Sequence, residues 1–379
     1  MNVSAPLKEV TLPTHAMKKT LHLFGLLIAM STTAVDPLIG QVHPTIAGQL
    51  STLEGKSYMS LTITGEVGKA YLIVYTTDLS QPITWRLLTS FALSTNPYLW
   101  IDTTSAPAAR RFYQAEMSPA VPIANMVFIP PGTFTMGSPG SEAEHASDET
   151  QHQVTLTQGF WMGKYETTQE EYLSVMGNNP SFFRNGTESL WGGNGGVVTN
   201  ELMHPVERVS WSDATNYCGK LTQKEIEMGR IPGAWRYRLP TESEWEYACR
   251  AGSTNAFYDG RVLRRGMANF DAGREYDSSR GSIPTTNTYL GRTTIVGSYA
   301  ANAYGLYDMR GNVYEFCQDW YGMYPRGSVT DPSGPTNASE HLFRGGGWNS
   351  IGWSCRSARR LGIGGGGGNV GFRIVLSSH

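Results

Sequence analysis

The chain has 379 residues, enough for two or three domains of ordinary size. Charged residues make up 16% of it, while glycine occurs 43 times and tryptophan 10 times. This composition is typical of a loop-rich domain with aromatic side chains between irregular segments, and it disfavours a helical bundle. The net charge is −2 and no basic block is present, so nothing in the chain would attract nucleic acid by charge.

An export signal is predicted near the N-terminus. Met17-Lys18-Lys19 precede an apolar run from Leu21 to Met30, and small residues follow as far as Ala34. These are the parts of a secretory signal peptide, and the apolar run is too short for a membrane-spanning helix. We predict a signal peptide over residues 1–35, with Met17 as an alternative start. The other interpretation is a buried helix. No other segment is expected to span a membrane.

If the signal is used, the mature protein is exported and is periplasmic, secreted or attached to the cell surface. Disulfides are permitted in those compartments.

Residues 36–118 are predicted to form a small all-β sandwich. Met59, Leu61 and Ile63 alternate with hydroxyl side chains, which is the period-two pattern of a half-buried strand. Further short strand-like runs follow at the spacing typical of a sandwich. The segment contains no constellation of catalytic residues and is interpreted as a spacer or attachment module. Residues 119–123 are predicted to be a linker.

The remainder, residues 124–379, begins with strand-like runs and then contains three predicted helix starts. Thr168 with Glu171, and Thr241 with Glu244, have the spacing of a capping box. Ser212-Asp213 are predicted to cap a third helix over residues 214–221.

Two long segments of this part, residues 177–204 and 253–296, are rich in glycine, asparagine and serine and are predicted to be loops. Loops of that length inside a compact domain are often functional. The stretch from Arg344 to Arg373 contains a third irregular segment around Gly364 to Gly368, and binding residues concentrate on such loops.

Several ordered motifs carry a family resemblance. They are Met126 to Gly137, His204-Pro205-Val206, Val209-Ser210-Trp211, Arg238 to Tyr247, Tyr304 to Met309, Gly311 to Glu315 and Gly371-Phe372-Arg373. Over residues 124–377 they resemble the formylglycine-generating enzyme family, also called the sulfatase-modifying factor family. The resemblance implies an α+β fold of the C-type-lectin-like kind, with the sandwich in front of it.

Three kinds of protein share this family pattern, and each implies a different function. One oxidises a cysteine of sulfatases to formylglycine, one is part of iron-dependent enzymes, and one is a group of ligand-binding proteins whose C-terminal loop is diversified by a retroelement. The iron-dependent kind needs three clustered histidines. The eight histidines of this chain are scattered, so this kind is disfavoured.

The oxidase of the family holds copper(I) between two thiolates five residues apart, just after Gly-Gly-Ser. Aligned on Gly345-Gly346, the first thiolate position falls on Ser350 and the second on Cys355, and Gly347 replaces the serine. A hydroxyl does not replace a thiolate for copper(I), so the copper site is incomplete. The alternative is an oxidase with an altered copper site formed by Cys355 and Ser350. Copper is expected as a cofactor only under that alternative.

Cys355 also has structural interpretations. It is either a buried thiol or half of a disulfide with Cys317, and four cysteines allow three pairings.

Calcium is the cofactor that the resemblance implies. Asn312 and Glu315 with the carbonyl of Val313 resemble one calcium site of the family, and oxygen ligands of this kind suit calcium. The backbone carbonyls of Asn269 and Phe270, together with Asp277, are candidates for a second site. The alternative is that Asn312 caps a turn and Glu315 pairs with an arginine.

The third kind of relative makes the C-terminal loop a contact surface. Under that interpretation, a protein or glycan ligand contacts apolar side chains with arginines at the rim, and the protein is a monomer. The alternative is that these side chains are buried. The predicted contact residues are Ser350, Ile351, Gly352, Trp353, Ser354, Arg360, Leu361, Gly362, Ile363 and Asn369. The sequence therefore predicts an exported binding module that is not catalytic, with an oxidase of altered copper site as the alternative.

Overall fold

A computed structural model describes ten stretches of the chain. They are residues 45–53, 56–65, 70–77, 86–92, 97–102, 111–118, 125–231, 233–286, 289–363 and 368–378. The predicted signal peptide and the predicted linker lie outside these residues. Among the described residues, no helix is long and apolar enough to cross a lipid bilayer.

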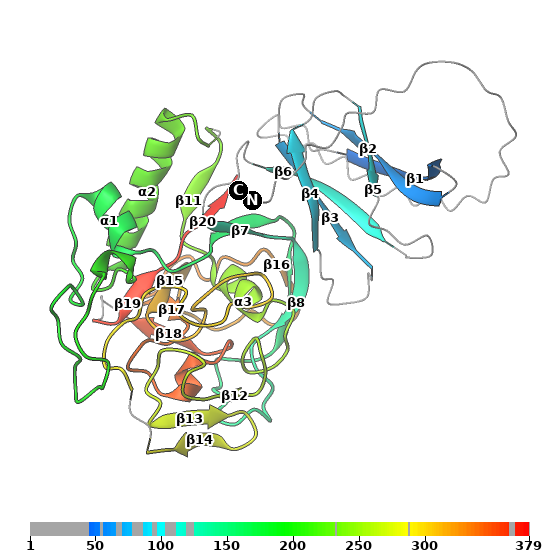
Figure 1. The fold of residues 1–379 in the computed structure, drawn as a ribbon. Coiled ribbons are helices and arrows are strands. Elements are labelled where there is room, and N and C mark those ends of the chain that lie inside the picture. Colours follow the sequence, from blue (N-terminus) through cyan, green and yellow to red (C-terminus); the bar gives the residue numbers. More distant parts are fainter. Residues whose placement is uncertain are drawn as a thin grey trace, which may run out of the picture.

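The N-terminal strands form two three-stranded antiparallel sheets (Figure 1). One sheet has the order β1-β2-β5 and the other β4-β3-β6. Leu61 and Ile63 of the first sheet share one buried core with Tyr71 and Ile73 of the second, so the predicted sandwich is confirmed. The strands are β1 (Thr45–Leu53), β2 (Lys56–Thr64), β3 (Ala70–Thr76), β4 (Arg86–Ala92), β5 (Tyr98–Asp102) and β6 (Phe112–Ser118).

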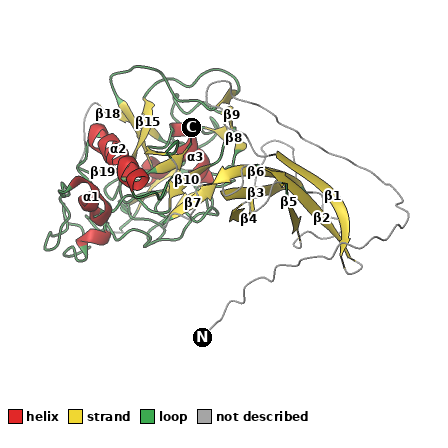
Figure 2. Ribbon diagram, turned by 90° about the horizontal axis from the view of Figure 1, so that it is seen from above, coloured by secondary structure: helices red, strands yellow, loops and turns green. Residues whose placement is uncertain are grey.

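The C-terminal part, from residue 125 onward, combines four small sheets with three α-helices, as an α+β fold requires (Figure 2). The first strand of this part, β7, joins the last, β20, through β10 in the order β11-β20-β10-β7, so the two ends of the domain lie in one sheet. Its strands are β7 (Met126–Ile129), β10 (Phe160–Gly163), β11 (Arg236–Arg238) and β20 (Val375–Ser377).

A second sheet carries the C-terminal segment in the order β18-β17-β15-β19. β15 pairs antiparallel with β17 and parallel with β19. A third sheet has the order β16-β9-β8. The strands of these two sheets are β8 (Gly132–Met136), β9 (His152–Leu156), β15 (Tyr314–Trp320), β16 (Val329–Thr330), β17 (His341–Arg344), β18 (Arg360–Ile363) and β19 (Val370–Phe372).

All three α-helices begin at a complete capping box. The predicted starts of α1 (Gln169–Met176) at Thr168 and of α3 (Glu242–Arg250) at Thr241 are confirmed. The predicted cap of α2 (Trp211–Glu227) is wrong, because Ser210 is the N-cap and Asp213 supplies the reciprocal hydrogen bond. Ser210 with Asp213 has the same three-residue spacing as the other two boxes, with aspartate in place of glutamate.

The β15–β17 sheet separates two apolar cores because successive side chains of a strand point to opposite faces. Phe316 and Phe343 pack with side chains of α1 and α2, whereas Cys317 and Leu342 pack with side chains of α3. The sheet that carries the C-terminal segment is thus covered by helices on both faces, which fixes the position of that segment.

The two predicted long loops differ in the structure. Residues 177–204 contain one short 3-10 helix at their end, η1 (Glu201–Met203), and are otherwise irregular. The prediction of a loop over residues 253–296 is wrong in part, because a three-stranded antiparallel sheet forms within it. Its strands are β12 (Val262–Leu263), β13 (Arg274–Asp277) and β14 (Gly281–Pro284).

Candidate functional site

The glycines after β17 form a turn that packs directly on Cys355. Gly345 and Gly346 both have positive φ, at 94° and 79°, which glycine adopts without the strain of a side chain. A Cβ at Gly346 would lie 2.5 Å from the Cys355 sulfur. The Gly-Gly pair therefore brings the backbone against the thiol, and a larger residue does not fit there.

Cys355 ends a short 3-10 helix, η2 (Gly352–Cys355), and is buried. Burial raises the pKa of its thiol to about 12, although Arg310 acts in the opposite direction. In the absence of a metal, the group is therefore a neutral thiol at physiological pH. Ser350 occupies the other copper position, is 7% exposed, and accepts a hydrogen bond from the Gly347 amide at 2.9 Å.

The disulfide alternative for Cys355 is wrong. All four cysteines, namely Cys218, Cys249, Cys317 and Cys355, are buried free thiols. The Cys249 sulfur lies 3.5 Å from the Met309 carbonyl oxygen and 3.6 Å from the Ser357 hydroxyl. The buried-thiol interpretation of Cys355 is the one that the structure supports.

The arginines of the C-terminal segment point inward and are held by buried carboxylates. Arg344 pairs with Glu246 of α3, and Arg356 pairs at 2.7 Å with Glu149 on the loop between β8 and β9. Other ion pairs of the same kind are Arg356 with Glu142, Arg360 with Glu242 and Arg373 with Glu315. A buried guanidinium needs such partners, so these arginines fix the segment to the scaffold and do not form a rim around a ligand.

The predicted contact residues divide into buried and partly exposed groups. Ser350, Gly352, Ser354 and Arg360 are buried, Arg360 to 2% exposure, so the expectation that they face outward is wrong. Among the predicted contact residues whose burial is described, a partner can reach the partly exposed ones, which are Ile351, Trp353, Leu361, Gly362 and Asn369. Ile363 belongs to β18.

The apolar side chains among these residues also take part in packing. Leu361 packs against the core of α1 and α2, and Trp353 packs against the cluster around Phe257 and Tyr276. The Arg359 guanidinium lies 4.5 Å from the centre of the Trp353 ring.

The residues of the first predicted calcium site already have protein partners. The Glu315 carboxylate accepts hydrogen bonds from Arg373, at 2.7 Å, and from the Trp245 indole, at 2.8 Å. The Asn312 side-chain oxygen accepts from Asn269 at 3.0 Å and from the Thr294 amide at 2.9 Å. Because these oxygens already accept hydrogen bonds from protein donors, they do not fit a calcium ion in this arrangement. The pairing of Glu315 with Arg373 agrees with the alternative prediction, in which Glu315 pairs with an arginine.

The second predicted calcium site fits no better. The Asp277 carboxylate accepts from the Ser279 amide and hydroxyl at 2.8 and 2.7 Å, and the Asn269 carbonyl accepts from the Asn312 amide at 2.8 Å. Among the described residues, no three histidine, cysteine, aspartate or glutamate side chains are grouped to hold a metal ion.

Glu166 is a buried residue that the sequence did not single out. Its carboxylate accepts hydrogen bonds from the Asn312 side chain at 2.6 Å and from the Val313 amide at 3.1 Å. Burial raises the pKa of Glu166 well above its usual value, and the nearby charges of Asp308 and Glu315 raise it further. Only the tertiary structure brings Glu166, some 146 residues before Asn312, into this cluster.

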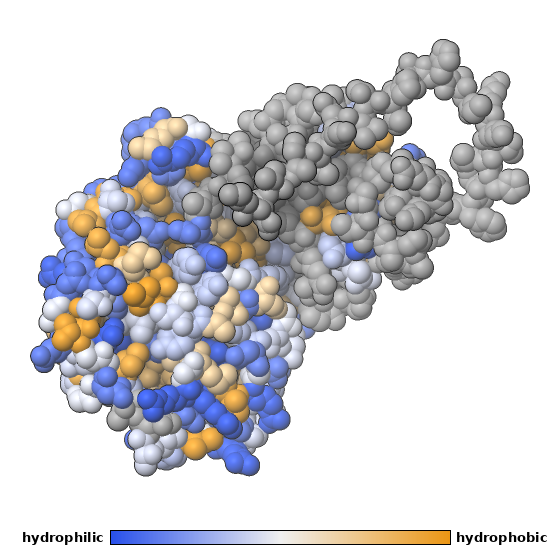
Figure 3. Space-filling model, in the orientation of Figure 1, coloured by the Kyte–Doolittle hydropathy of each residue, from blue (hydrophilic) through white to orange (hydrophobic). Residues whose placement is uncertain are grey.

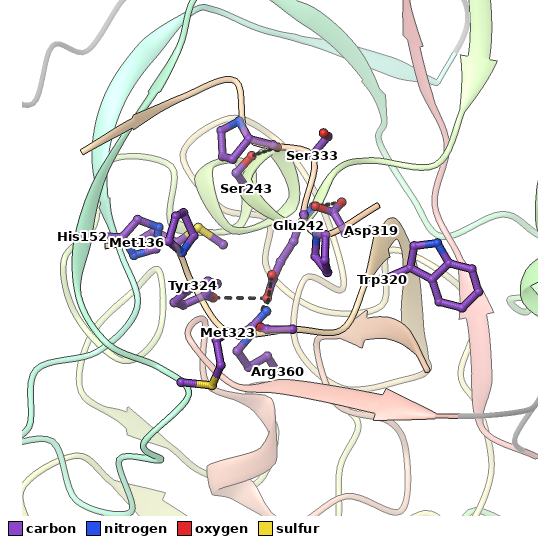
Figure 4. A pocket seen from close by; sticks show the side chains of 15 residues that line it. Met136, His152, Glu242, Ser243, Asp319, Trp320, Met323, Tyr324, Ser333 and Arg360 are labelled. Atoms are coloured by element: carbon purple, nitrogen blue, oxygen red, sulfur yellow. Dashed lines mark hydrogen bonds and ion pairs between the residues drawn. The ribbon is translucent and has the colours of Figure 1, made fainter. Parts of the chain in front are cut away.

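A cavity of about 330 Å³ opens beside the start of α3 (Figure 4). Glu242 and Asp319 lie at its buried floor, and the exposed Met323 and Ser333 border its mouth. Glu242 accepts two hydrogen bonds from Arg360, at 2.8 and 2.7 Å. Of these residues, the sequence singled out Arg360 alone, and it gave no signal that Asp319 lies beneath the helix start, 77 residues away.

The fold defines a C-type-lectin-like α+β domain, and its C-terminal segment has one thiol, Cys355, with a serine at position 350. Residues 112–378 match the family model described as "Sulfatase-modifying factor enzyme 1-like domain". The chain belongs to this family. The match begins within β6, ahead of the predicted boundary at residue 124.

Similar proteins have diverse names. The chain is 34% identical over 226 residues to "Chaperone protein LppX" of Paenibacillus barcinonensis, covering 52% of this chain and 71% of that protein. It is 28% identical over 292 residues to the mouse "Formylglycine-generating enzyme", covering 64% and 73%. It is 30% identical over 271 residues to "Serine/threonine-protein kinase pkn1" of Chlamydia pneumoniae, covering 67% of this chain but only 38% of the kinase.

Two solved structures have the same fold. "Treponema denticola variable protein 1" superposes with a TM-score of 0.51 and 27% identity, over 66% of this chain and 94% of that one. PvdO from Pseudomonas aeruginosa gives a TM-score of 0.50 and 29% identity, over 66% and 94%.

Proposed function

We propose that this chain is an exported ligand-binding protein that uses the scaffold of the formylglycine-generating enzymes without their oxidase chemistry. The observation that carries the proposal is the pair of positions 350 and 355. One is a serine whose hydroxyl accepts a backbone hydrogen bond, and the other is a buried thiol whose pKa is raised to about 12. Copper(I) selects soft sulfur ligands, and this pair offers a single sulfur.

The proposed binding surface is the partly exposed side of the C-terminal segment. Ile351, Trp353 and Leu361 each keep part of their apolar surface accessible. On the face shown in Figure 3, apolar side chains are scattered among polar ones. A small mixed surface of this kind suits a protein or glycan ligand held by a few aromatic and aliphatic contacts. The similarity to the Treponema variable protein supports this role.

An oxidase assay tests the absence of chemistry. Purified protein is incubated with copper and a peptide that carries a Cys-x-Pro-x-Arg motif, and mass spectrometry follows conversion of the thiol to an aldehyde. We expect no aldehyde. Aldehyde from the unaltered protein would overturn the proposal in favour of an oxidase that works with Cys355 alone, the alternative that similarity to the mouse enzyme favours.

A binding screen and the genomic neighbourhood test the positive half of the proposal. On an array of glycans and peptides, we expect the double variant Ile351→Ser, Leu361→Ser to lose the signal. Leu173→Ser, which alters a leucine with 40% exposure on α1, should retain it. Equal binding by both variants would contradict the proposed surface. A neighbouring reverse transcriptase gene with a near-copy of the C-terminal coding segment would support diversification, and a neighbouring sulfatase gene would support the oxidase.

A further inference from the structure

Asp319, at the floor of the cavity beside α3, is a buried carboxyl group without a cationic partner among the described residues. It is 4% exposed, and its Oδ2 accepts a hydrogen bond from the Glu242 amide at 2.8 Å. The arginines near it are engaged elsewhere, Arg360 with Glu242 and Arg238 with Glu244, each at 2.7 Å. Burying a charge without a partner is costly, so a cation that reached Asp319 would stabilise it.

The second carboxylate oxygen of Asp319 faces the loop at the cavity mouth. A Cβ added at Gly334 would lie 2.8 Å from this Oδ1 atom, so the loop passes close to the oxygen at a residue without a side chain. Gly334 has a φ of 73° and is exposed, as are its neighbours Ser333 and Pro335. A side chain at this position would meet the Asp319 carboxylate, so glycine leaves the space beside this oxygen free of one.

The cavity walls are mainly apolar and aromatic. The side chains are Met136, Trp320, Met323, Tyr324, Pro325 and Pro335. An alkyl chain can bury its surface against such walls. A cavity of about 330 Å³ has room for one short chain of this kind.

Among the described residues, the charged and titratable groups around Asp319 form no ion pair with it, although Arg238 is near enough to interact with its charge. They are Glu242 and Glu244 from α3, Arg238 from β11, Arg360 from β18, Arg344 from β17, Cys317 from β15, His152 from β9 and Tyr324. Glu244 pairs with Arg238, and Glu242 pairs with Arg360 and lies 3.7 Å from Arg344. Burial, and next the charge of Glu242, raise the pKa of Asp319 to about 7.

We propose that this cavity binds an alkylammonium or alkylguanidinium group, with the charged end at Asp319 and the alkyl chain directed toward Met323 at the cavity mouth. The group is that of a free amine or of a lysine or arginine side chain. This site does not depend on the proposed function, because its residues take no part in the pair at positions 350 and 355.

Calorimetric titration of the full chain tests the proposal. The probes are n-butylammonium and n-butylguanidinium, with n-butanol as the neutral control. A blocked peptide with a central lysine, compared with its norleucine counterpart, distinguishes a side chain from a free amine. We expect the cations to bind and n-butanol to bind at least about tenfold more weakly, because only the cations pair with a desolvated carboxylate. Equal affinity for butanol, or no binding of either cation, would overturn the proposal.

The pH dependence gives a second readout. The cation needs the ionised carboxylate, so its affinity should rise by about tenfold per unit at a pH well below the pKa of Asp319, and level off above about pH 8. An affinity that stays constant between about pH 5 and about pH 8 would show that Asp319 is not the partner.

Two variants test separately the charge of Asp319 and the access to the cavity. Asp319→Asn keeps an acceptor for the Glu242 amide and should weaken cation binding by at least about tenfold. Ser333→Trp at the mouth should block entry and leave Asp319 in place. Glu170→Gln, at an exposed carboxylate on α1, is the matched control and should not change the affinity. Unchanged affinity in Asp319→Asn, at a melting temperature like that of the unaltered protein, would refute the assignment.

Discussion

Replacement of Arg373 by methionine tests the idea that buried ion pairs hold the C-terminal segment. Arg373 is fully buried and donates hydrogen bonds to both oxygens of Glu315, at 2.7 and 3.0 Å, and to the carbonyls of Gly163 and Tyr307, both at 2.8 Å. Methionine keeps much of the side-chain volume but removes every donor. Glu315 would then keep the Trp245 indole as a partner but lose its cation.

The expected loss of stability depends on the charge of Glu315, which stays buried after Arg373 is removed. Removing one partner of a buried ion pair costs about 3–5 kcal/mol, because the other charge stays buried and unpaired. Glu166 and Asp308 also lose the favourable charge of Arg373, which lowers the pKa of both in the intact protein. We therefore expect the free energy of unfolding to fall by about 4 kcal/mol near neutral pH.

The sign of the pH dependence is fixed by the carboxylates. Burial raises the pKa of Asp308 to about 6, above its value in the unfolded chain, and loss of Arg373 would raise it further. A group with a raised pKa binds protons on folding, so its contribution to stability falls as the pH rises through the interval between the unfolded and folded pKa values. The deficit of the variant should therefore be at least about 1 kcal/mol smaller at pH 5 than at pH 8.

Urea unfolding followed by tryptophan fluorescence at pH 5 and pH 8 measures both effects. Arg264→Met, at an exposed arginine, is the matched control and should change stability by no more than about 0.5 kcal/mol. The double variant Arg373→Met, Glu315→Gln should recover part of the loss because it removes the stranded charge. A deficit equal to that of Arg264→Met at both pH values would refute the reasoning.

Two further predictions concern the turn and the thiols. Gly346→Ala should lower the free energy of unfolding by more than about 1 kcal/mol, since the new Cβ strains a left-handed backbone and meets the Cys355 sulfur. Gly196→Ala, with a similar φ of 67° in open space, should cost less, and equal losses in urea unfolding would contradict the packing argument. The four buried thiols should react with Ellman's reagent only after denaturation, because burial raises the pKa of each. Rapid reaction of one native thiol would show that it is accessible.

Local sequence patterns were sufficient to predict the helix starts and strands that depend only on neighbouring residues. A capping box spans four residues, so Thr168 and Thr241 marked their helix starts without knowledge of the rest of the chain. The alternation around Leu61 and Ile63 likewise reflects one strand and its own two faces. The family resemblance, aligned on Gly345-Gly346, implied two thiolate positions and placed a serine at the first, Ser350, and a cysteine at the second, Cys355.

Only the tertiary structure decided which side chains of the C-terminal segment face inward. Arginine is usually exposed, so Arg360 was predicted at a contact rim, yet its partner Glu242 lies 118 residues earlier and makes its burial stable. Asp319 was not singled out at all, because a buried carboxyl without a cation becomes visible only when β15, α3 and the loop at the cavity mouth are assembled. Burial and the pairing of charges depend on contacts between distant segments, and no local pattern in the chain records them.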